Sequence, residues 1–123
     1  MALSVTPQAS PLGASLVQQT ESNATPVLNA TGDPGSIFMI EIDNSAVGVD
    51  VYLKIYDNLA PTVGTTAADW VVRCPGLARR SCVIPGGYEF SNGLSFATVT
   101  EADQTGTIDP PGGSVAVRIV TSP

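Results

Sequence analysis

The sequence predicts an all-β protein, an antiparallel β-sandwich preceded by an extended N-terminal arm. Short apolar segments alternate with polar residues from Ile37 to Thr121, and Gly, Pro and Asn interrupt them at short intervals. Several short strands at such spacing are typical of sandwiches. No ten-residue window free of Gly and Pro carries apolar side chains at helical spacing, so no helix is expected.

Residues 1–35 are expected to form the arm, and residues 36–123 the sandwich domain. The arm is rich in Ser, Thr, Gln, Asn, Pro and Ala, and Glu21 is its only charged residue before Asp33. Short strands are expected in it at most around 14–20 and 26–30, because prolines interrupt any long ladder. Such an arm gains order by lying on its own domain or on a neighbouring subunit. The alternative is a first edge strand preceded by a frayed tail.

The first two strands of the domain are expected at 37–42 and 49–56. The first follows the turn signal of Asp33, Pro34 and Gly35. The second alternates with period two, which places Val49, Val51, Leu53 and Ile55 on one face and Asp50, Tyr52, Lys54 and Tyr56 on the other. One of these faces belongs in the core, and the other lies in water or against a partner. We therefore expect the only lysine to be a solvated charge on the outer face.

Further strands are expected at 68–74, 81–84, 88–90, 94–100 and 114–121. The segment 81–84 is interpreted as a hairpin return that ends at Pro85, Gly86 and Gly87. The core is expected to contain Trp70, Phe90, Phe96, Val115, Val117 and Ile119.

Composition excludes several classes of function. The chain has no histidine, so the usual proton shuttle near neutral pH and the commonest metal ligand are both missing. A formal charge of −6 disfavours nucleic acid and anionic membranes as partners. No apolar stretch approaches a membrane span, and residues 1–10 lack the features of a secretory signal, so folding in the cytosol is expected.

No catalytic, cofactor-binding or metal-binding residues are expected. Cys74 and Cys82 are too far apart for a redox pair and too few for zinc, so we interpret them as reduced thiols, with a disulfide between them as the alternative. A glycosidase that uses two carboxylates is the one enzyme class that composition permits, but no spacing singles out a pair. The start of a calcium loop is imitated by Glu101, Asp103, Thr105 and Gly106, but Gly112 stands where the bidentate Glu should be.

Five residues are candidates for contact with another protein. Tyr52 and Tyr56 fall on the polar face of their strand, and tyrosine is enriched at protein interfaces. Arg73, Arg79 and Arg80 place three of the five basic groups around one hairpin, where they could bind carboxylates on a partner. The alternative for the arginines is a solvated turn in which they balance local acids.

Residues 45–100 resemble a small family of virion proteins of tailed phages. The likeness lies in the strand 51–57 with its Tyr-Leu-Lys-Ile-Tyr sequence, the loop Ala-Pro-Thr-Val-Gly-Thr at 60–65, and the later segment 90–97 with its Gly-Leu-Ser-Phe sequence. The hairpin between Cys74 and Cys82 and the long arm depart from the family pattern.

This resemblance implies a jelly-roll-like sandwich, a structural role in the virion and no enzymatic activity. We expect a capsid cement or decoration protein that binds the major capsid protein of the assembled head. It would be a homo-oligomer, preferably a trimer, made and assembled in the cytoplasm of the host bacterium. The alternatives are a tail, fibre or baseplate component that binds carbohydrate or has a connecting role and, less favoured, the carboxylate-pair glycosidase.

Overall fold

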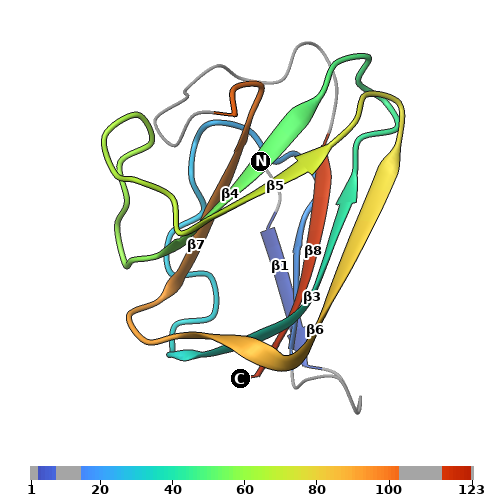
Figure 1. Cartoon of the computed structure of the whole chain (residues 1–123). Helices are drawn as coiled ribbons and strands as arrows, with labels where there is room; N and C mark the ends of the chain where they lie inside the picture. The colour runs from blue at the N-terminus through green and yellow to red at the C-terminus, as the bar shows by residue number, and fades with distance from the viewer. Residues whose placement is uncertain (1–2, 8–14, 103–114, 123) are drawn as a thin grey trace.

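The computed structural model describes residues 3–7, 15–102 and 115–122, which form eight strands in two antiparallel sheets (Figure 1). The strands are β1 (Leu3–Pro7), β2 (Ser15–Gln19), β3 (Gly35–Asp43), β4 (Val51–Asp57), β5 (Trp70–Cys74), β6 (Arg79–Phe90), β7 (Leu94–Val99) and β8 (Ala116–Ser122). The prediction of an all-β antiparallel sandwich is confirmed.

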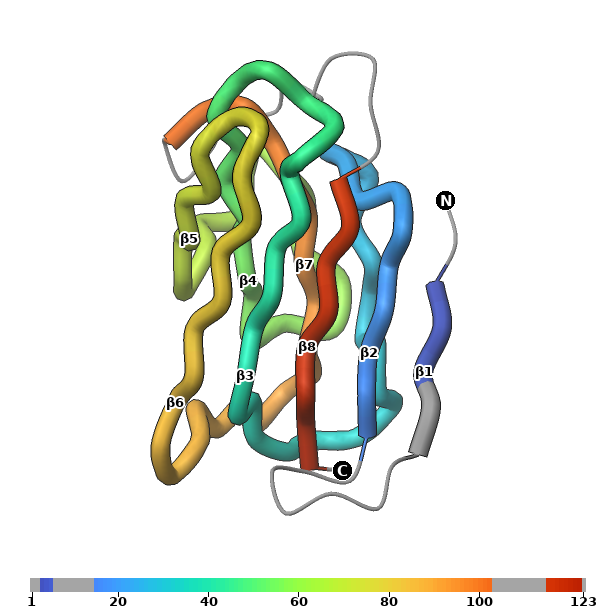
Figure 2. Tube along the Cα trace, turned by 90° about the vertical axis from the view of Figure 1, so that its right-hand side faces the viewer, coloured from blue at the N-terminus to red at the C-terminus, as the bar shows by residue number. Residues whose placement is uncertain are grey.

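One sheet has five strands in the order β1-β2-β8-β3-β6, and the other has three in the order β5-β4-β7. Figure 2 shows the five-stranded sheet in front, with β6 and β1 at its two edges and the smaller sheet behind it. The edge strands β5 and β6 lie on the same side of the sandwich. There the ring of Trp70 on β5 contacts the ring of Tyr88 on β6, with centroids 4.6 Å apart and planes tilted by 52°.

The core fills the space between the two sheets. Alternate residues of β4 and β8 face it, as period two requires, and their side chains are fully buried. Burying each such side chain stabilises the fold by about 1.5–3 kcal/mol. The predicted core residues Val115, Val117, Ile119, Phe90 and Phe96 are at most 1% exposed, whereas Trp70 is partly buried and packs against the core.

The described residues of the expected arm lie within the sandwich. β2 pairs with β8 over five residues, from Ser15 opposite Thr121 to Gln19 opposite Val117. Val17 is 0% exposed and belongs to the core cluster. β1 adds an edge strand to β2 that the sequence analysis did not assign. Residues 1–2 and 8–14 lie outside the described part of the chain.

The segment 22–30 continues the smaller sheet beyond β7. Val27 and Phe96 exchange two backbone hydrogen bonds of 2.8 and 3.1 Å, and the Thr98 N–H donates to the Asn23 carbonyl at 2.9 Å. Only the bridge between Val27 and Phe96 has strand geometry, so the short strand expected around 26–30 is reduced to that pair. The segment nonetheless covers the edge of β7 with backbone hydrogen bonds.

β6 is one strand of twelve residues, so the expected stop at Pro85, Gly86 and Gly87 is wrong. These residues form a bulge instead, because Ile37 lies opposite Tyr88 while Met39 lies opposite Val83. Gly86 and Gly87 both have a φ of 81°, a conformation suited to glycine. The Phe38 ring packs on Gly87, where an added Cβ would lie 2.9 Å from the Phe38 Cε1.

The expectation of a wet outer face on β4 is also wrong. Lys54 and Tyr56 are both 0% exposed. Ala68, Ala97 and the partly buried Val63 pack around Tyr56, because the connection between β4 and β5 folds back over the outer face of the smaller sheet. Val49, which was assigned to the core, precedes the strand and is 43% exposed.

Candidate contact surfaces

The structure brings four of the five predicted contact residues close to one end of the sandwich. Tyr52 and Arg73 are cross-strand neighbours on β4 and β5. Arg79 and Arg80 begin β6, just after the β5–β6 connection. The fifth residue, Tyr56, is fully buried, so its assignment as a contact residue on the surface is wrong. Burial raises the pKa of its hydroxyl group.

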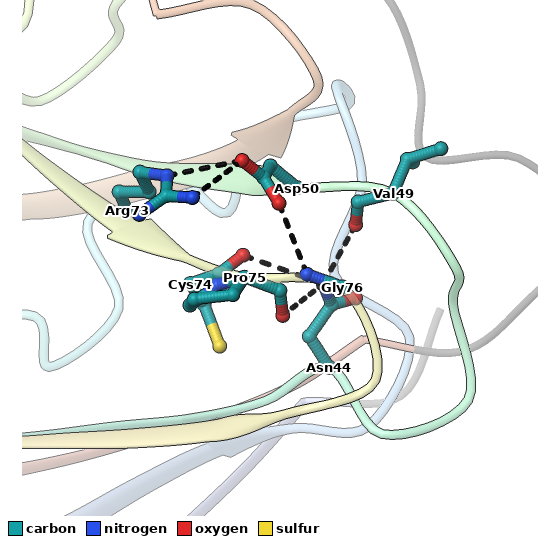
Figure 3. A network of polar contacts seen from close by, with 7 residues as sticks. All are labelled: Asn44, Val49, Asp50, Arg73, Cys74, Pro75 and Gly76. Carbon is teal, nitrogen blue, oxygen red and sulfur yellow. Dashed lines mark hydrogen bonds and ion pairs between the residues drawn. The ribbon is translucent and has the colours of Figure 1, made fainter.

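Asn44 joins the β3–β4 loop to the β5–β6 connection (Figure 3). Its side-chain NH₂ donates to the carbonyl oxygens of Val49 at 2.9 Å, Pro75 at 3.0 Å and Cys74 at 3.4 Å. Its backbone N–H donates to the Ala78 carbonyl at 2.9 Å. Asn44 is 0% exposed, its bond to Cys74 is buried and those to Val49 and Pro75 are partly buried, so this side chain holds the two loops together from inside.

Asp50 extends this network to the surface. Its carboxylate accepts hydrogen bonds from Arg73 Nε at 3.0 Å, from Arg73 Nη2 at 2.7 Å and from the Gly76 N–H at 3.1 Å. The hydrogen bond from Arg73 and then that from Gly76 lower the pKa of Asp50. The same pairing raises the pKa of Arg73.

The three arginines differ in their partners. Arg73 pairs with Asp50, and Arg79 pairs with Asp43 at 3.2 Å. The pKa of Asp43 is lowered mainly by hydrogen bonds from Ser45 and further by the charge of Arg79. Arg80 is exposed and makes no ion pair with any residue that the structure describes. Arg73 and Arg79 therefore balance local acids, as the alternative interpretation of the sequence predicted.

Leu77 lies at the tip of the β5–β6 connection and was not singled out by sequence analysis. It is 70% exposed and has a φ of 58°. This left-handed conformation costs a leucine roughly 1–2 kcal/mol. The Leu77 N–H donates to the Val47 carbonyl at 2.8 Å, which holds the backbone in place. The available signal was an apolar residue directly after Pro75 and Gly76 in a turn.

An apolar row crosses the outer face of the five-stranded sheet. Leu16 lies opposite Val120, Val120 opposite Met39, and Met39 opposite Val83, across β2, β8, β3 and β6. Val83 is 59% exposed, Leu16 and Met39 are partly exposed, and Val120 is 4% exposed. We name this row, together with Phe38 beside Met39 at the bulge, the sheet stripe. The row is therefore exposed mainly at its β6 end, and an apolar row on the outside of a sheet is a candidate for contact with another protein.

The row next to the sheet stripe is polar. Arg118 lies opposite both Gln18 and Glu41, and its guanidinium is 3.8 Å from the Glu41 carboxylate. Sequence analysis did not find the sheet stripe, because alternation within one strand does not reveal which residues of other strands stand beside it.

The opposite end of the sandwich carries a pocket of about 220 Å³ lined by Asp57, Asn58, Leu59 and Asn92. The Asp57 carboxylate accepts hydrogen bonds from the backbone N–H groups of Asn92 at 2.8 Å, Ser91 at 3.1 Å and Gly93 at 3.3 Å. Burial opposes ionisation of Asp57, but these hydrogen bonds outweigh it and lower the pKa.

Three of the described acidic residues have shifted pKa values, and none of the three suits the role of a general acid. The pKa shifts of Asp43, Asp50 and Asp57 are all downward, whereas a general acid needs a raised pKa.

Within residues 3–7, 15–102 and 115–122 no three potential ligands gather to hold a metal ion. Of the calcium-like loop, Asp103, Thr105, Gly106 and Gly112 lie outside the described residues.

Both cysteines are free thiols. Cys74 is buried, and its Sγ lies 3.5 Å from the Ala78 carbonyl and 3.7 Å from that of Ile42. Burial raises its pKa, so the reactive thiolate is disfavoured.

No helix in the described part of the chain is long and apolar enough to cross a membrane. Comparisons with family models, with curated proteins and with solved structures found no match.

Proposed function

We propose that this chain is a virion structural protein, a capsid cement or decoration protein that binds the assembled head of a phage. The observation that carries the proposal is the sheet stripe, an apolar row on the outside of a folded sandwich. Such a row gains free energy when a second surface removes it from water. The partner is the major capsid protein.

The strand order supports a jelly-roll assignment. The four strands β2-β8-β3-β6 lie across from the bridge segment at Val27 followed by β7, β4 and β5. The strand β2, near the start of the chain, thus pairs with the last strand, β8, as in two nested Greek keys. Jelly rolls occur in viral capsid and lectin domains. Fold likeness raises the expectation of a virion role without specifying it.

The proposed mechanism is stabilisation by binding only the assembled shell. A protein that binds the shell but not its dissociated subunits shifts the equilibrium toward assembly by mass action. Many copies on one shell add their effects, and an oligomer, a trimer in our preferred form, adds avidity. The formal charge of −6 keeps decorated particles apart in solution.

A carbohydrate-binding role in the tail is less well supported. Such a role favours aromatic side chains that form exposed platforms. Trp70 instead packs against the core and Tyr88, and Tyr56 is buried. A glycosidase is less well supported because the shifted carboxyl pKa values are all lowered.

The test uses heads of the phage that encodes this chain, stripped of the protein and then reloaded with purified variants. Wild-type protein is expected to co-sediment with the heads and to restore their tolerance to heat. Val83→Asp, which places a charge in the sheet stripe, is expected to weaken binding at least tenfold. Val71→Asp on β5 is the matched control, because Val71 is 38% exposed and lies outside the sheet stripe.

Failure of wild-type protein to bind the heads would refute the proposal. Equal binding by Val83→Asp would refute the role of the sheet stripe. Densitometry of intact virions gives a separate check, since a decoration protein is present in hundreds of copies and a tail component in a few dozen.

A further inference from the structure

The tip of the β5–β6 connection presents an apolar side chain to solvent on a backbone that hydrogen bonds hold in place. Leu77 has the highest exposed fraction among the large apolar residues described, 70%. Its backbone is held by Val47 on one side, and Asn44 and Asp50 hold the neighbouring Pro75 and Gly76. A loop whose backbone is already held in place loses little backbone entropy when it binds.

The surroundings of Leu77 are basic in a protein that is acidic overall. Arg80 follows three residues later and has no described acidic partner, and Arg79 and Arg73 are exposed at 71% and 53% even though they are paired. A surface complementary to this tip combines an apolar contact with carboxylates.

The opposite end of the same sandwich has this character. Figure 2 shows the β5–β6 connection at one end of the strands and the β6–β7 connection at the other. Asp57 ends β4, Asp69 precedes β5 and Glu89 lies near the end of β6. The described segments at this end, 31–37, 57–70 and 85–96, contain no lysine or arginine.

The pocket at this acidic end has room for a leucine side chain. Its volume is about 220 Å³, and Leu59, which is 54% exposed, forms its apolar wall. The remaining lining residues are polar: Asp57, Asn58 and Asn92. They can contact Arg80 of a second copy when Leu77 of that copy is inserted.

We propose that this chain self-associates head to tail, with Leu77 of one copy in the Leu59 pocket of the next and Arg80 facing the Asp57 carboxylate of that pocket. The contact joins opposite ends of the molecule, so it is heterologous and produces a closed ring or an open filament. The inference goes beyond capsid binding and is tested on the purified protein alone.

Sedimentation velocity of the purified chain tests this contact. Wild-type protein is expected to form oligomers that weaken as salt is added, because screening reduces the attraction of Arg80 for the acidic end. Leu77→Asn removes the apolar tip while keeping a residue that tolerates positive φ. This variant and Leu59→Asp are each expected to be monomeric, and Arg80→Glu is expected to weaken association at least tenfold.

Mixing the two monomeric variants distinguishes this contact from other modes of association. Leu59→Asp retains an intact tip and Leu77→Asn retains an intact pocket, so their mixture is expected to form a one-to-one dimer and nothing larger. Val83→Asp is the control and is expected to associate like wild type, since it lies in the sheet stripe. A monomeric wild type, oligomers of either end variant, or a mixture that stays monomeric would each overturn the proposal.

Discussion

Substitution of Asn44 tests whether one buried amide holds an end of the sandwich together. The Asn44 side-chain NH₂ serves three carbonyl oxygens at 2.9, 3.0 and 3.4 Å. Asn44→Ala leaves them without this donor in a site that is 0% exposed. A buried acceptor left without a partner costs about 1–3 kcal/mol. Since the two short contacts are only partly buried and the fully buried one is long, we expect a loss of about 2–3 kcal/mol.

Asn44→Asp adds a charge to the same geometry. Its carboxylate would face three carbonyl oxygens in a buried site, so its pKa in the folded state is expected to rise above the unfolded value of about 3.9. The penalty is then greatest at neutral pH and shrinks as the pH falls toward that value. At neutral pH the loss is expected to be at least as large as that of Asn44→Ala.

Urea denaturation followed by far-UV circular dichroism measures these differences. Asn58→Asp is the matched control, because the Asn58 side chain acts as an acceptor from the Ala60 N–H at 2.9 Å and aspartate keeps that acceptor. It is expected to change stability by less than about 0.5 kcal/mol. If Asn44→Ala lies within about 1 kcal/mol of wild type, the reasoning fails, because the three carbonyls would then not depend on this amide.

Three further predictions concern stability and use the same urea assay. Leu77→Asn is expected to stabilise the monomer by about 0.5–1 kcal/mol, because it relieves a left-handed leucine that is mostly exposed; a loss of stability would contradict the strain argument. Gly76→Ala is expected to cost about 1–3 kcal/mol, since its Cβ would lie 2.7 Å from the Gly48 backbone, and a neutral result would contradict that close approach. The pKa of Asp57 is lowered in the folded state, so its contribution is present above the unfolded pKa of about 3.9 and is lost as the pH falls through the folded value. Asp57→Asn is expected to be less stable at neutral pH and to lose less stability on acidification, and an acid profile identical to wild type would contradict this role.

Local patterns predicted the fold class and much of the core. Val51, Leu53 and Ile55 were placed inward from their period-two spacing, and all three are buried. This succeeds because the direction of a side chain in a strand depends only on its position along that strand. The inward-facing Val117 and Ile119 of β8 follow the same rule.

The same rule does not say what covers the other face of a strand. Lys54 and Tyr56 alternate with core residues and were expected in water, yet the folded-back connection between β4 and β5 helps to bury that face. Pro85, Gly86 and Gly87 have the composition of a strand end. Pairing with β3 and the packing of Phe38 on Gly87 keep β6 continuous through them as a bulge.

The candidate surfaces also differ in whether the sequence alone could predict them. Arg73, Arg79 and Arg80 could be grouped from the sequence, because they lie near one another along the chain. The sheet stripe could not, since Leu16, Val120, Met39 and Val83 become neighbours only through the registers of four strands. Nor could the pocket at Leu59, whose walls come from the end of β4 and the β6–β7 turn.

Short-range patterns along the chain were enough to predict that it forms pleated strands and which face of most strands is apolar, because both depend on residues one or two positions apart. The tertiary structure decided which strands are neighbours, that Lys54 is buried and that Leu77 stands alone at a rigid tip. These features depend on contacts between residues that are far apart in the chain, and the packing of the whole molecule selects among the local alternatives.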